Sequence, residues 1–242
     1  MRTLVTGSSG FIGAKVMRTL LANEQHEVFG SVRRFSDDEV LRSRQLLVGD
    51  LGPNTDWARA LEGMDVVIHA AARVHVMKKS RRTAAGDYRN ANTLGTINLA
   101  RQAAGAGISR FVLISSIKVN GERTEDGSAF CEQDRPEPVD PYGLSKYEAE
   151  CGLRSICEET GMEYVILRPA LVYGPRVRAN FEALMRLICS GVPLPLAGIE
   201  NSRSMIALDN LADLISSCVT SPTAANELFL ASDGVDMSTT EL

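Results

Sequence analysis

The sequence predicts an α/β fold, a doubly wound parallel sheet with helices on both faces. Short apolar segments rich in Val, Ile and Leu alternate with helical segments over the first 168 of the 242 residues. Strands of a parallel sheet are covered by helices on both faces, so they read as nearly continuous apolar runs. A glycine-rich turn between the first strand and the first helix fits the same architecture.

The individual elements follow from this alternation. Their apolar runs are short enough for strands, and the segments between them have helical periodicity. The expected strands cover residues 3–7, 26–32, 45–50, 64–71, 109–116 and 162–169, and the expected helices cover residues 10–24, 54–63, 89–107 and a segment beginning after Asp140.

Beyond residue 168 the rhythm changes, because prolines and glycines concentrate in residues 168–177 and 190–204. Such residues favour loops and turns. We therefore expect a dinucleotide-binding domain over residues 1–168 and a small substrate lobe over residues 169–204, with one helix at 180–191. Residues 205–242 should return to the core sheet or its edge, with strands at 204–208 and 226–232.

The last residues carry a helix-start signal. Ser238 and Glu241 have capping-box spacing, which marks the first turn of a helix that the sequence does not continue. We expect the natural protein to be longer, with a truncated substrate lobe here.

Composition limits the possible partners and location. The net charge is −4 and the pI is near 5.5, which argues against nucleic acid as a partner. No apolar run approaches the ~18 residues of a membrane span, and we expect no secretory leader, because the first residues run directly into a strand. Five cysteines without paired metal spacing fit free thiols in a reducing compartment, so we expect a cytoplasmic protein without a metal site.

The stretch VTGSSGFIG places Gly7, Gly10 and Gly13 between the first strand and the first helix. Glycines at such a turn let backbone N–H groups and the helix N-terminus approach a pyrophosphate without a Cβ in the way. A glycine-rich turn alone can be an ordinary strand–helix connection. Its position in the order strand, loop, helix favours dinucleotide binding.

The stretch DPYGLSKYEAE contains Tyr142 and Lys146 four positions apart. Residues at i and i+4 lie on one face of a helix, so the two side chains point the same way. Taken alone, this pair is compatible with a solvated helix face.

Several ordered motifs together resemble the extended, nucleotide-sugar-modifying branch of the short-chain dehydrogenase/reductases, which have a Rossmann-like fold. The motifs are TGSSGFIG, GDL at 49–51, VIHAAA at 67–72, NTLGTINL at 92–99, LISSIKVNG, YGLSK and RPALVYGP. The resemblance implies that Ser116, Tyr142 and Lys146 are catalytic. It implies cofactor contacts from Gly7, Gly10, Phe11, Ile12, Gly13, Arg33, Asp50, Leu51, Ala70, Ala71, Ala72, Tyr142 and Lys146.

The residue after the second strand bears on the choice of cofactor. An acid there would bind the ribose 2′-OH of NAD, whereas an arginine would favour the 2′-phosphate of NADP. The sequence has Arg33 and Arg34 at this point, and it resembles NADPH-dependent members of the family. Asp37 and Asp38 lie close in sequence to these two arginines, which leaves NAD as an alternative.

The chemistry of carbonyl reduction gives the three catalytic candidates their roles. Hydride arrives at carbon and a proton at oxygen, so the site needs an acid, here Tyr142. A nearby ammonium group lowers a tyrosine pKa, which is the role expected of Lys146. Ser116, which precedes Val119 at the S/T-x-x-V spacing of the family, would hydrogen-bond the substrate oxygen; Ser115 would be a strand-end residue.

The residues beside Ser116 argue against dehydration. Sugar dehydratases of this branch have a T-D-E triplet, where this chain has Ser116, Ile117 and Lys118. In the substrate lobe, Asn180 and Arg203 resemble residues that contact the nucleotide diphosphate, and a guanidinium matches phosphate oxygens well. A helix cap and a surface ion pair are the alternatives for these two residues.

Together these features predict an NADP-dependent reductase of a nucleotide-linked 4-keto sugar, with UDP as the expected nucleotide. The resemblance places it in bacterial surface-polysaccharide precursor synthesis such as that of O-antigen, with a homodimer possible. The alternative is a UDP-hexose 4-epimerase with tightly bound NAD, and a remoter one is a non-catalytic NADP-sensing regulator. We expect His69, His75 and Trp57 to be packing or surface residues.

Overall fold

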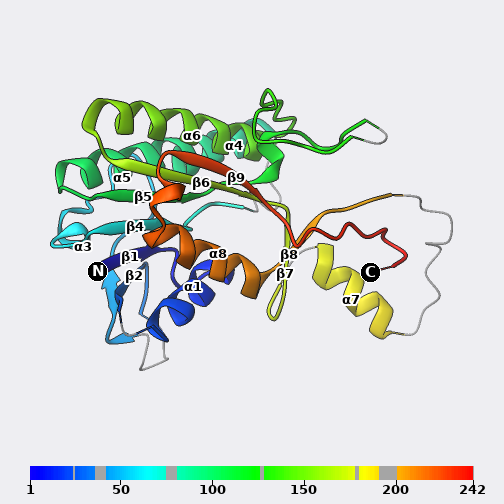
Figure 1. Cartoon of the computed structure of the whole chain (residues 1–242), viewed down its shortest axis with the longest axis horizontal. Coiled ribbons are helices and arrows are strands. Elements are labelled where there is room, and N and C mark those ends of the chain that lie inside the picture. Colours follow the sequence, from blue (N-terminus) through cyan, green and yellow to red (C-terminus); the bar gives the residue numbers. More distant parts are fainter. Residues whose placement is uncertain are drawn as a thin grey trace.

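The computed structural model describes residues 1–23, 25–35, 42–74, 81–125, 128–177, 180–190 and 201–241. The predicted α/β fold is confirmed (Figure 1). Seven strands form one parallel sheet in the order β3-β2-β1-β4-β5-β6-β9. The strands are β1 (Arg2–Thr6), β2 (Glu27–Val32), β3 (Gln45–Leu47), β4 (Val66–His69), β5 (Arg110–Ile114), β6 (Glu163–Pro169) and β9 (Glu227–Ala231).

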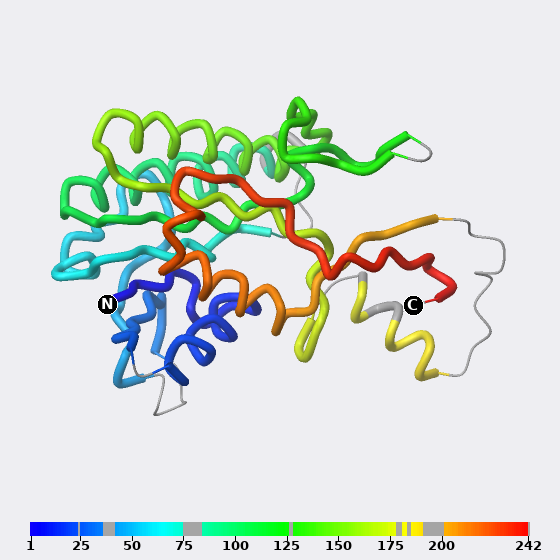
Figure 2. Tube along the Cα trace, viewed as in Figure 1, coloured from blue at the N-terminus to red at the C-terminus, as the bar shows by residue number. Residues whose placement is uncertain are grey.

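The helices form a layer on each face of this sheet (Figure 2). Helices α1 (Phe11–Leu21) and α8 (Leu208–Thr220) pack on one face. The other face carries α3 (Ala58–Leu61), α5 (Gly95–Gly105) and α6 (Pro141–Thr160). The remaining helical elements are α4 (Arg81–Tyr88), the π-helical turn η1 (Arg89–Leu94), the 3-10 turns η2 (Ile117–Val119) and η3 (Pro222–Ala224), and α7 (Asn180–Cys189).

Alternation along the strands explains the two cores. Val66 and Ile68 of β4 join the core under α1 and α8, whereas Val67 between them joins the core under α5 and α6. The same alternation runs through β5 and β6. Successive side chains of a strand point to opposite faces, so apolar residues at every position fill both cores.

Three expectations about elements need correction. The helix expected over 54–63 is only α3, because the Thr55 carbonyl is bound by the Asn98 and Gln102 side chains instead of continuing a helix. The strand expected at 204–208 is β8 (Met205–Ala207), which pairs with β7 (Leu171–Tyr173) in a separate two-stranded sheet. Helix α8, between β8 and β9, was not expected.

Capping hydrogen bonds form at two positions where the sequence predicts a helix to begin. Asp140 caps α6 by accepting a hydrogen bond from the Gly143 backbone N–H at 2.6 Å. Ser238 and Glu241 form the two reciprocal hydrogen bonds of a capping box. Within the described ranges, no helix combines the length and the apolar character needed to cross a membrane.

The strand order determines where a ligand can bind. β1 lies between β2 and β4, so the chain reverses its direction of winding at β1. In open parallel sheets, ligands bind at this reversal, outside the carboxyl ends of the strands. The glycine turn after β1 and the segments after β2, β4 and β5 all lie at this edge.

Candidate functional site

The turn between β1 and α1 has the tight geometry that a phosphate loop requires. Gly7 has a φ of 65°, a left-handed conformation that glycine adopts without strain. A Cβ added to Gly13 would lie 2.2 Å from the Gly7 carbonyl oxygen, and a Cβ on Gly7 would lie 2.8 Å from the Ala71 backbone. Gly10 caps α1 without a side-chain hydrogen bond, so the first N–H groups of Phe11, Ile12 and Gly13 remain open to an anion. These residues fit a pyrophosphate.

The segment after β4 is held against this turn by a buried histidine. The His69 ring bridges two threonines, with Nδ1 2.7 Å from Thr6 Oγ1 and Nε2 2.9 Å from Thr96 Oγ1. Thr6 Oγ1 also accepts a hydrogen bond from the Ala71 N–H at 3.2 Å. Burial, aided by the charge of Lys146, lowers the pKa of His69 to about 3, so the ring is neutral. His69 is therefore a packing residue, as expected, with a definite place beside Ala70, Ala71 and Ala72.

Asn92, in the π-helical turn η1, connects the same segment to α6. Its Oδ1 accepts the Arg73 N–H at 2.7 Å, and its Nδ2 donates to the Arg73 carbonyl and to Ser145 Oγ, both at 3.0 Å. π-helical turns are rare and often lie at functional sites. The NTLGTINL motif pointed to this helix, but spacing alone could not reveal the irregular turn.

Arg33 lies directly after β2, where the ribose of a dinucleotide would be recognised. Both its side chain and that of Asp50 are well exposed, and they form an ion pair with Nη1 and Oδ1 3.1 Å apart. Leu51, the next residue, is partly buried, and a Cβ on Gly95 would lie 2.9 Å from its Cγ. Asp37 and Asp38, the residues that complicate the cofactor choice, fall outside the described residues.

The predicted catalytic serine and tyrosine meet in the structure. Ser116 precedes the 3-10 turn η2, and its hydroxyl acts on the Tyr142 side chain near the start of α6 by lowering the tyrosine pKa. Ser115 points the other way, since its buried hydroxyl donates to the Glu150 carboxylate. The two adjacent serines thus have different surroundings in the structure, and the catalytic role of Ser116 stays a prediction.

The charges around Tyr142 set its acidity. Its pKa is raised to about 12, first by burial and then by the negative charge of Asp140. The positive charge of Lys118 and the Ser116 hydroxyl act in the opposite direction. Among the described residues, the cation that lowers this pKa is thus Lys118, a residue to which the sequence analysis gave no such role.

Lys146 lies on the same face of α6 and is among the largest fully buried side chains, only 1% exposed. Burial lowers its pKa to about 8, and the nearby Glu150 opposes this shift. Glu150 is itself buried and forms a bidentate ion pair with Arg168 at 2.6 and 3.0 Å. The ammonium group is thus held in a desolvated position beside a fixed ion pair.

Within the part of the chain that the structure describes, no interaction joins the two candidate diphosphate contacts to this centre. Asn180 begins α7, but its side chain falls outside the described residues. The Arg203 side chain is exposed, and its backbone pairs with Met237 through hydrogen bonds of 2.9 and 3.1 Å. Their predicted roles stay predictions.

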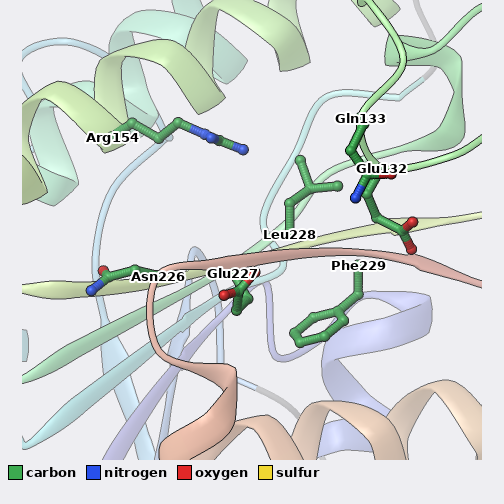
Figure 3. Close-up of a pocket in the computed structure, with 7 residues that line it drawn as sticks. All are labelled: Glu132, Gln133, Arg154, Asn226, Glu227, Leu228 and Phe229. Atoms are coloured by element: carbon green, nitrogen blue, oxygen red, sulfur yellow. The ribbon is translucent and has the colours of Figure 1, made fainter.

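A separate hollow of about 380 Å³ lies beside β9, the edge strand of the sheet (Figure 3). Arg154 of α6 and Glu132 and Gln133 of a neighbouring loop face it, together with residues of β9. It contains none of the predicted catalytic residues.

Comparisons with known proteins agree with the motifs and the sheet. The NAD dependent epimerase/dehydratase family model matches residues 3–229. A protein of Vibrio cholerae called UDP-glucose 4-epimerase is 46% identical over 242 residues, covering 99% of this chain and 73% of that protein. An undecaprenol-linked N-acetylglucosaminyl 4-epimerase of Escherichia coli O157:H7 is 26% identical and covers 99% of this chain and 69% of its own length.

Solved structures give the same result. UDP-glucuronic acid 4-epimerase from Bacillus cereus, in complex with UDP-glucuronic acid and NAD, has a TM-score of 0.86 at 25% identity, covering 100% of this chain and 80% of that chain. The dTDP-glucose 4,6-dehydratase DesIV from Streptomyces venezuelae, with NAD bound, has a TM-score of 0.82 at 28% identity, with coverage of 100% and 78%. The chain therefore belongs to the NAD dependent epimerase/dehydratase family, enzymes of the extended short-chain dehydrogenase/reductase type that the motifs predict.

Proposed function

We propose that this protein transfers hydride at C4 of a nucleotide-linked hexose, with Ser116, Tyr142 and Lys146 as its catalytic residues. The observation that carries the proposal is the packing of the Ser116 turn on the first turn of α6, which carries Tyr142, with Lys146 buried on the same face of that helix. A bound nicotinamide cofactor would supply the hydride. Tyr142 would deliver a proton to O4, and Ser116 would hydrogen-bond the same oxygen, so that a ketone becomes an alcohol. Lys146 would orient the cofactor ribose.

The cofactor would lie along the carboxyl edge of the sheet. Its pyrophosphate would bind the N-terminus of α1, where Gly7, Gly10 and Gly13 leave room for it. Asp50 and Leu51 would contact the adenine, and the backbone of Ala70 to Ala72 would line the cleft. The strand order and the glycine turn support the placement of the pyrophosphate, and the other contacts are those that the family resemblance implies.

We propose NADP as the cofactor and reduction of a 4-keto sugar as the reaction. Arg33 occupies the position after β2, and its exposed guanidinium could bind a 2′-phosphate. Ser116, Ile117 and Lys118 replace the acid and base that elimination of water requires, so another enzyme would make the keto substrate. A UDP-linked sugar would be held in the substrate lobe by Asn180 and Arg203.

A second candidate is a UDP-hexose 4-epimerase with tightly bound NAD. The Vibrio cholerae relative called UDP-glucose 4-epimerase, at 46% identity, favours it. The same three residues would serve, since an epimerase removes hydride from C4 and returns it to the opposite face. No net reducing equivalent would then be consumed.

The test gives purified protein a UDP-4-keto-6-deoxy sugar with NADPH, and separately UDP-glucose without added cofactor. We expect one NADPH oxidised for each 4-hydroxy product, followed by absorbance and NMR, and no UDP-galactose. Tyr142→Phe serves as the control for catalysis by this site. Interconversion of the UDP-hexoses without added cofactor would contradict the reductase assignment and support the epimerase. A lack of activity in both assays would contradict both candidate functions.

A further inference from the structure

The turn that carries Ser116 is packed directly on the first turn of α6. The Lys118 backbone N–H donates to Ser116 Oγ at 3.3 Å. On the α6 side, a Cβ added to Gly143 would lie 2.7 Å from the Lys118 carbonyl oxygen, so only glycine permits this approach. Lys118 therefore lies between the predicted catalytic serine and the helix that carries the predicted catalytic tyrosine.

The Lys118 side chain makes a second connection between the same two elements. Its Nζ lies 2.6 Å from Asp140 Oδ2 and 2.6 Å from Glu122 Oε1. Asp140 uses its other oxygen, Oδ1, to accept the Gly143 N–H that begins α6. One carboxylate thus caps the helix with one oxygen and binds the lysine of the neighbouring turn with the other.

The two charges of this ion pair act on Tyr142 in opposite directions. Asp140 raises the pKa of the Tyr142 hydroxyl, and Lys118 lowers it. From other elements, Tyr88 of α4 lies edge-on to the Tyr142 ring and raises the pKa, and the Ser116 hydroxyl lowers it. The buried groups further along α6 are Lys146 and the ion-paired Glu150, with Arg168 from β6.

We propose that Lys118 is a positioning residue, which holds the Ser116 turn against the start of α6 and offsets the charge of Asp140 beside Tyr142. The proposal rests on the proposed function insofar as Tyr142 is the acid of the reaction. Exposed ion pairs contribute about 0–1 kcal/mol to stability. The side chains of Lys118 and Asp140 are 40% and 32% exposed, respectively. This ion pair should therefore affect the Tyr142 hydroxyl more than the stability of the fold.

Kinetics of three variants test this role. Lys118→Met should lower kcat about tenfold and leave the cofactor KM within about twofold, because a loss of positioning acts on the chemical step. Lys118→Arg should restore most of kcat, since a guanidinium can bind both carboxylates. Glu122→Gln is the matched control, because it removes the other carboxylate partner of Lys118 without touching α6, and it should behave as the wild type. Equal effects of Lys118→Met and Glu122→Gln would overturn the proposal.

The pH dependence of activity is a second test, because a purely structural role of Lys118 would not shift it. In reduction Tyr142 must be protonated, so activity falls as pH rises through its pKa. Lys118→Met removes a positive charge and should move this alkaline limb to higher pH. Asp140→Asn keeps an oxygen for the cap but removes a negative charge, so it should move the limb to lower pH. Shifts in the same direction for both variants, or no shift in either, would contradict the proposal.

A measurement without substrate separates this proposal from the proposed function. Protein labelled with ¹³C at the tyrosine Cζ reports the ionisation of each ring, and Tyr142→Phe identifies the Tyr142 resonance. At pH 11 the ionised fraction of Tyr142 should be largest in Asp140→Asn, intermediate in the wild type and smallest in Lys118→Met. If this order holds in a protein inactive in both substrate assays, the proposed function fails and the role of Lys118 stands. Any other order overturns the role of Lys118.

Discussion

Tyr142 is the residue on which the proposed reaction depends most directly. It is partly buried, next to Ser116, and its elevated pKa keeps it protonated at neutral pH. Tyr142→Phe removes only the hydroxyl, so kcat should fall by about 10²–10⁴ with little change in cofactor affinity. Steady-state kinetics and a cofactor titration measure the two quantities. A variant that keeps most of its activity would remove Tyr142 from the mechanism.

His69 should make the protein sensitive to acid. Its folded pKa of about 3 lies below the ordinary value of 6.5, so the unfolded chain binds a proton more readily between these values. Stability should therefore fall as pH drops from 6.5 towards 3, by up to about 1.4 kcal/mol per pH unit from this residue. The His69→Gln variant should be less stable than the wild type at pH 7, but its stability should decline less steeply as the pH falls. Denaturant unfolding at several pH values tests this, and parallel curves for the two proteins would contradict it.

Sequence reasoning reached Ser116, Tyr142 and Lys146 because their spacing along the chain is itself the signal. It assigned no role to Lys118 because that role depends on a contact between a 3-10 turn and a helix start distant in sequence. The charge expected to lower the pKa of Tyr142 was that of Lys146. In the structure the charge of Lys118 also lowers the pKa of Tyr142. Helical spacing gives no information about charges that come from other elements.

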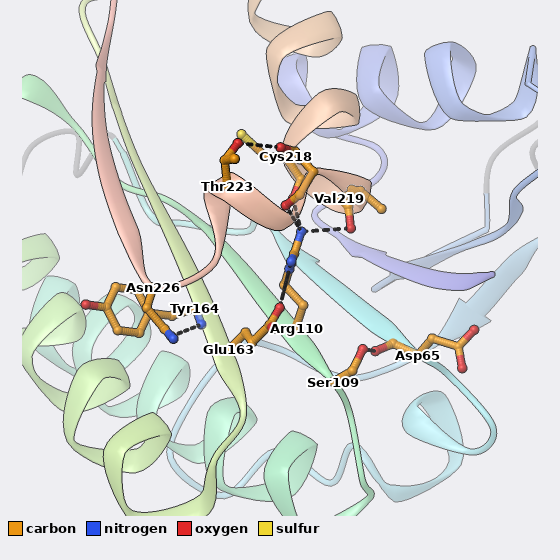
Figure 4. A network of polar contacts seen from close by, with 10 residues as sticks. Asp65, Ser109, Arg110, Glu163, Tyr164, Cys218, Val219, Thr223 and Asn226 are labelled. Atoms are coloured by element: carbon orange, nitrogen blue, oxygen red, sulfur yellow. Dashed lines mark hydrogen bonds and ion pairs between the residues drawn. The ribbon is translucent and has the colours of Figure 1, made fainter.

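Among the elements, α8 shows how a buried charge can hold a helix in place (Figure 4). Arg110, at the start of β5, is 7% exposed. Its Nη1 donates to the carbonyls of Cys218, Val219 and Ser221 at 2.8, 3.2 and 2.8 Å, where α8 ends. Its other nitrogens bind the Glu163 carboxylate of β6. A cation at a helix C-terminus also interacts favourably with the helix dipole.

Arg110→Met should therefore destabilise the protein by about 1–3 kcal/mol, because it leaves buried carbonyl groups at the end of α8 without a hydrogen-bond donor. Thermal or denaturant unfolding measures the loss. Arg101→Met, at an exposed position of α5, is the control and should change stability by less than about 0.5 kcal/mol. Similar losses of stability in the two variants would show that the contacts between Arg110 and the carbonyl groups make no specific contribution to stability.

The expected elements were most accurate where apolar runs are long. The six strands expected before residue 170 are all present, because their composition reflects burial on both faces. Helix α8 was missed because its sequence follows a proline-rich and glycine-rich region that suggested loops. The short α3 and the π-helical turn η1 depend on tertiary hydrogen bonds from Asn98, Gln102 and Asn92, which no local pattern encodes.

At the scale of the whole molecule, the strand order gathers the site from distant parts of the chain. β1 with its glycine turn, β2 with Arg33, β4 with Ala70 to Ala72 and β5 with Ser116 all end at one edge of the sheet. Because these strands form one sheet with two shared cores, a ligand bound along their ends contacts only the folded state. Such a ligand must raise the stability of the whole fold.

Cofactor choice can therefore be measured as a change in thermal stability, without any substrate. A ligand at 100 times its Kd stabilises the folded state by about 2.7 kcal/mol. We expect NADPH to raise Tm more than NADH at equal concentration, because Arg33 offers its guanidinium to the 2′-phosphate. Arg33→Ala should reduce the difference in binding free energy between NADPH and NADH by roughly 1.5–3 kcal/mol, which is the contribution of a hydrogen bond to a charged group. Asp50→Asn releases Arg33 from its ion pair and should preserve the preference. A wild-type protein stabilised more by NADH would instead favour the epimerase, because that reaction returns the hydride and needs no supply of reduced NADP.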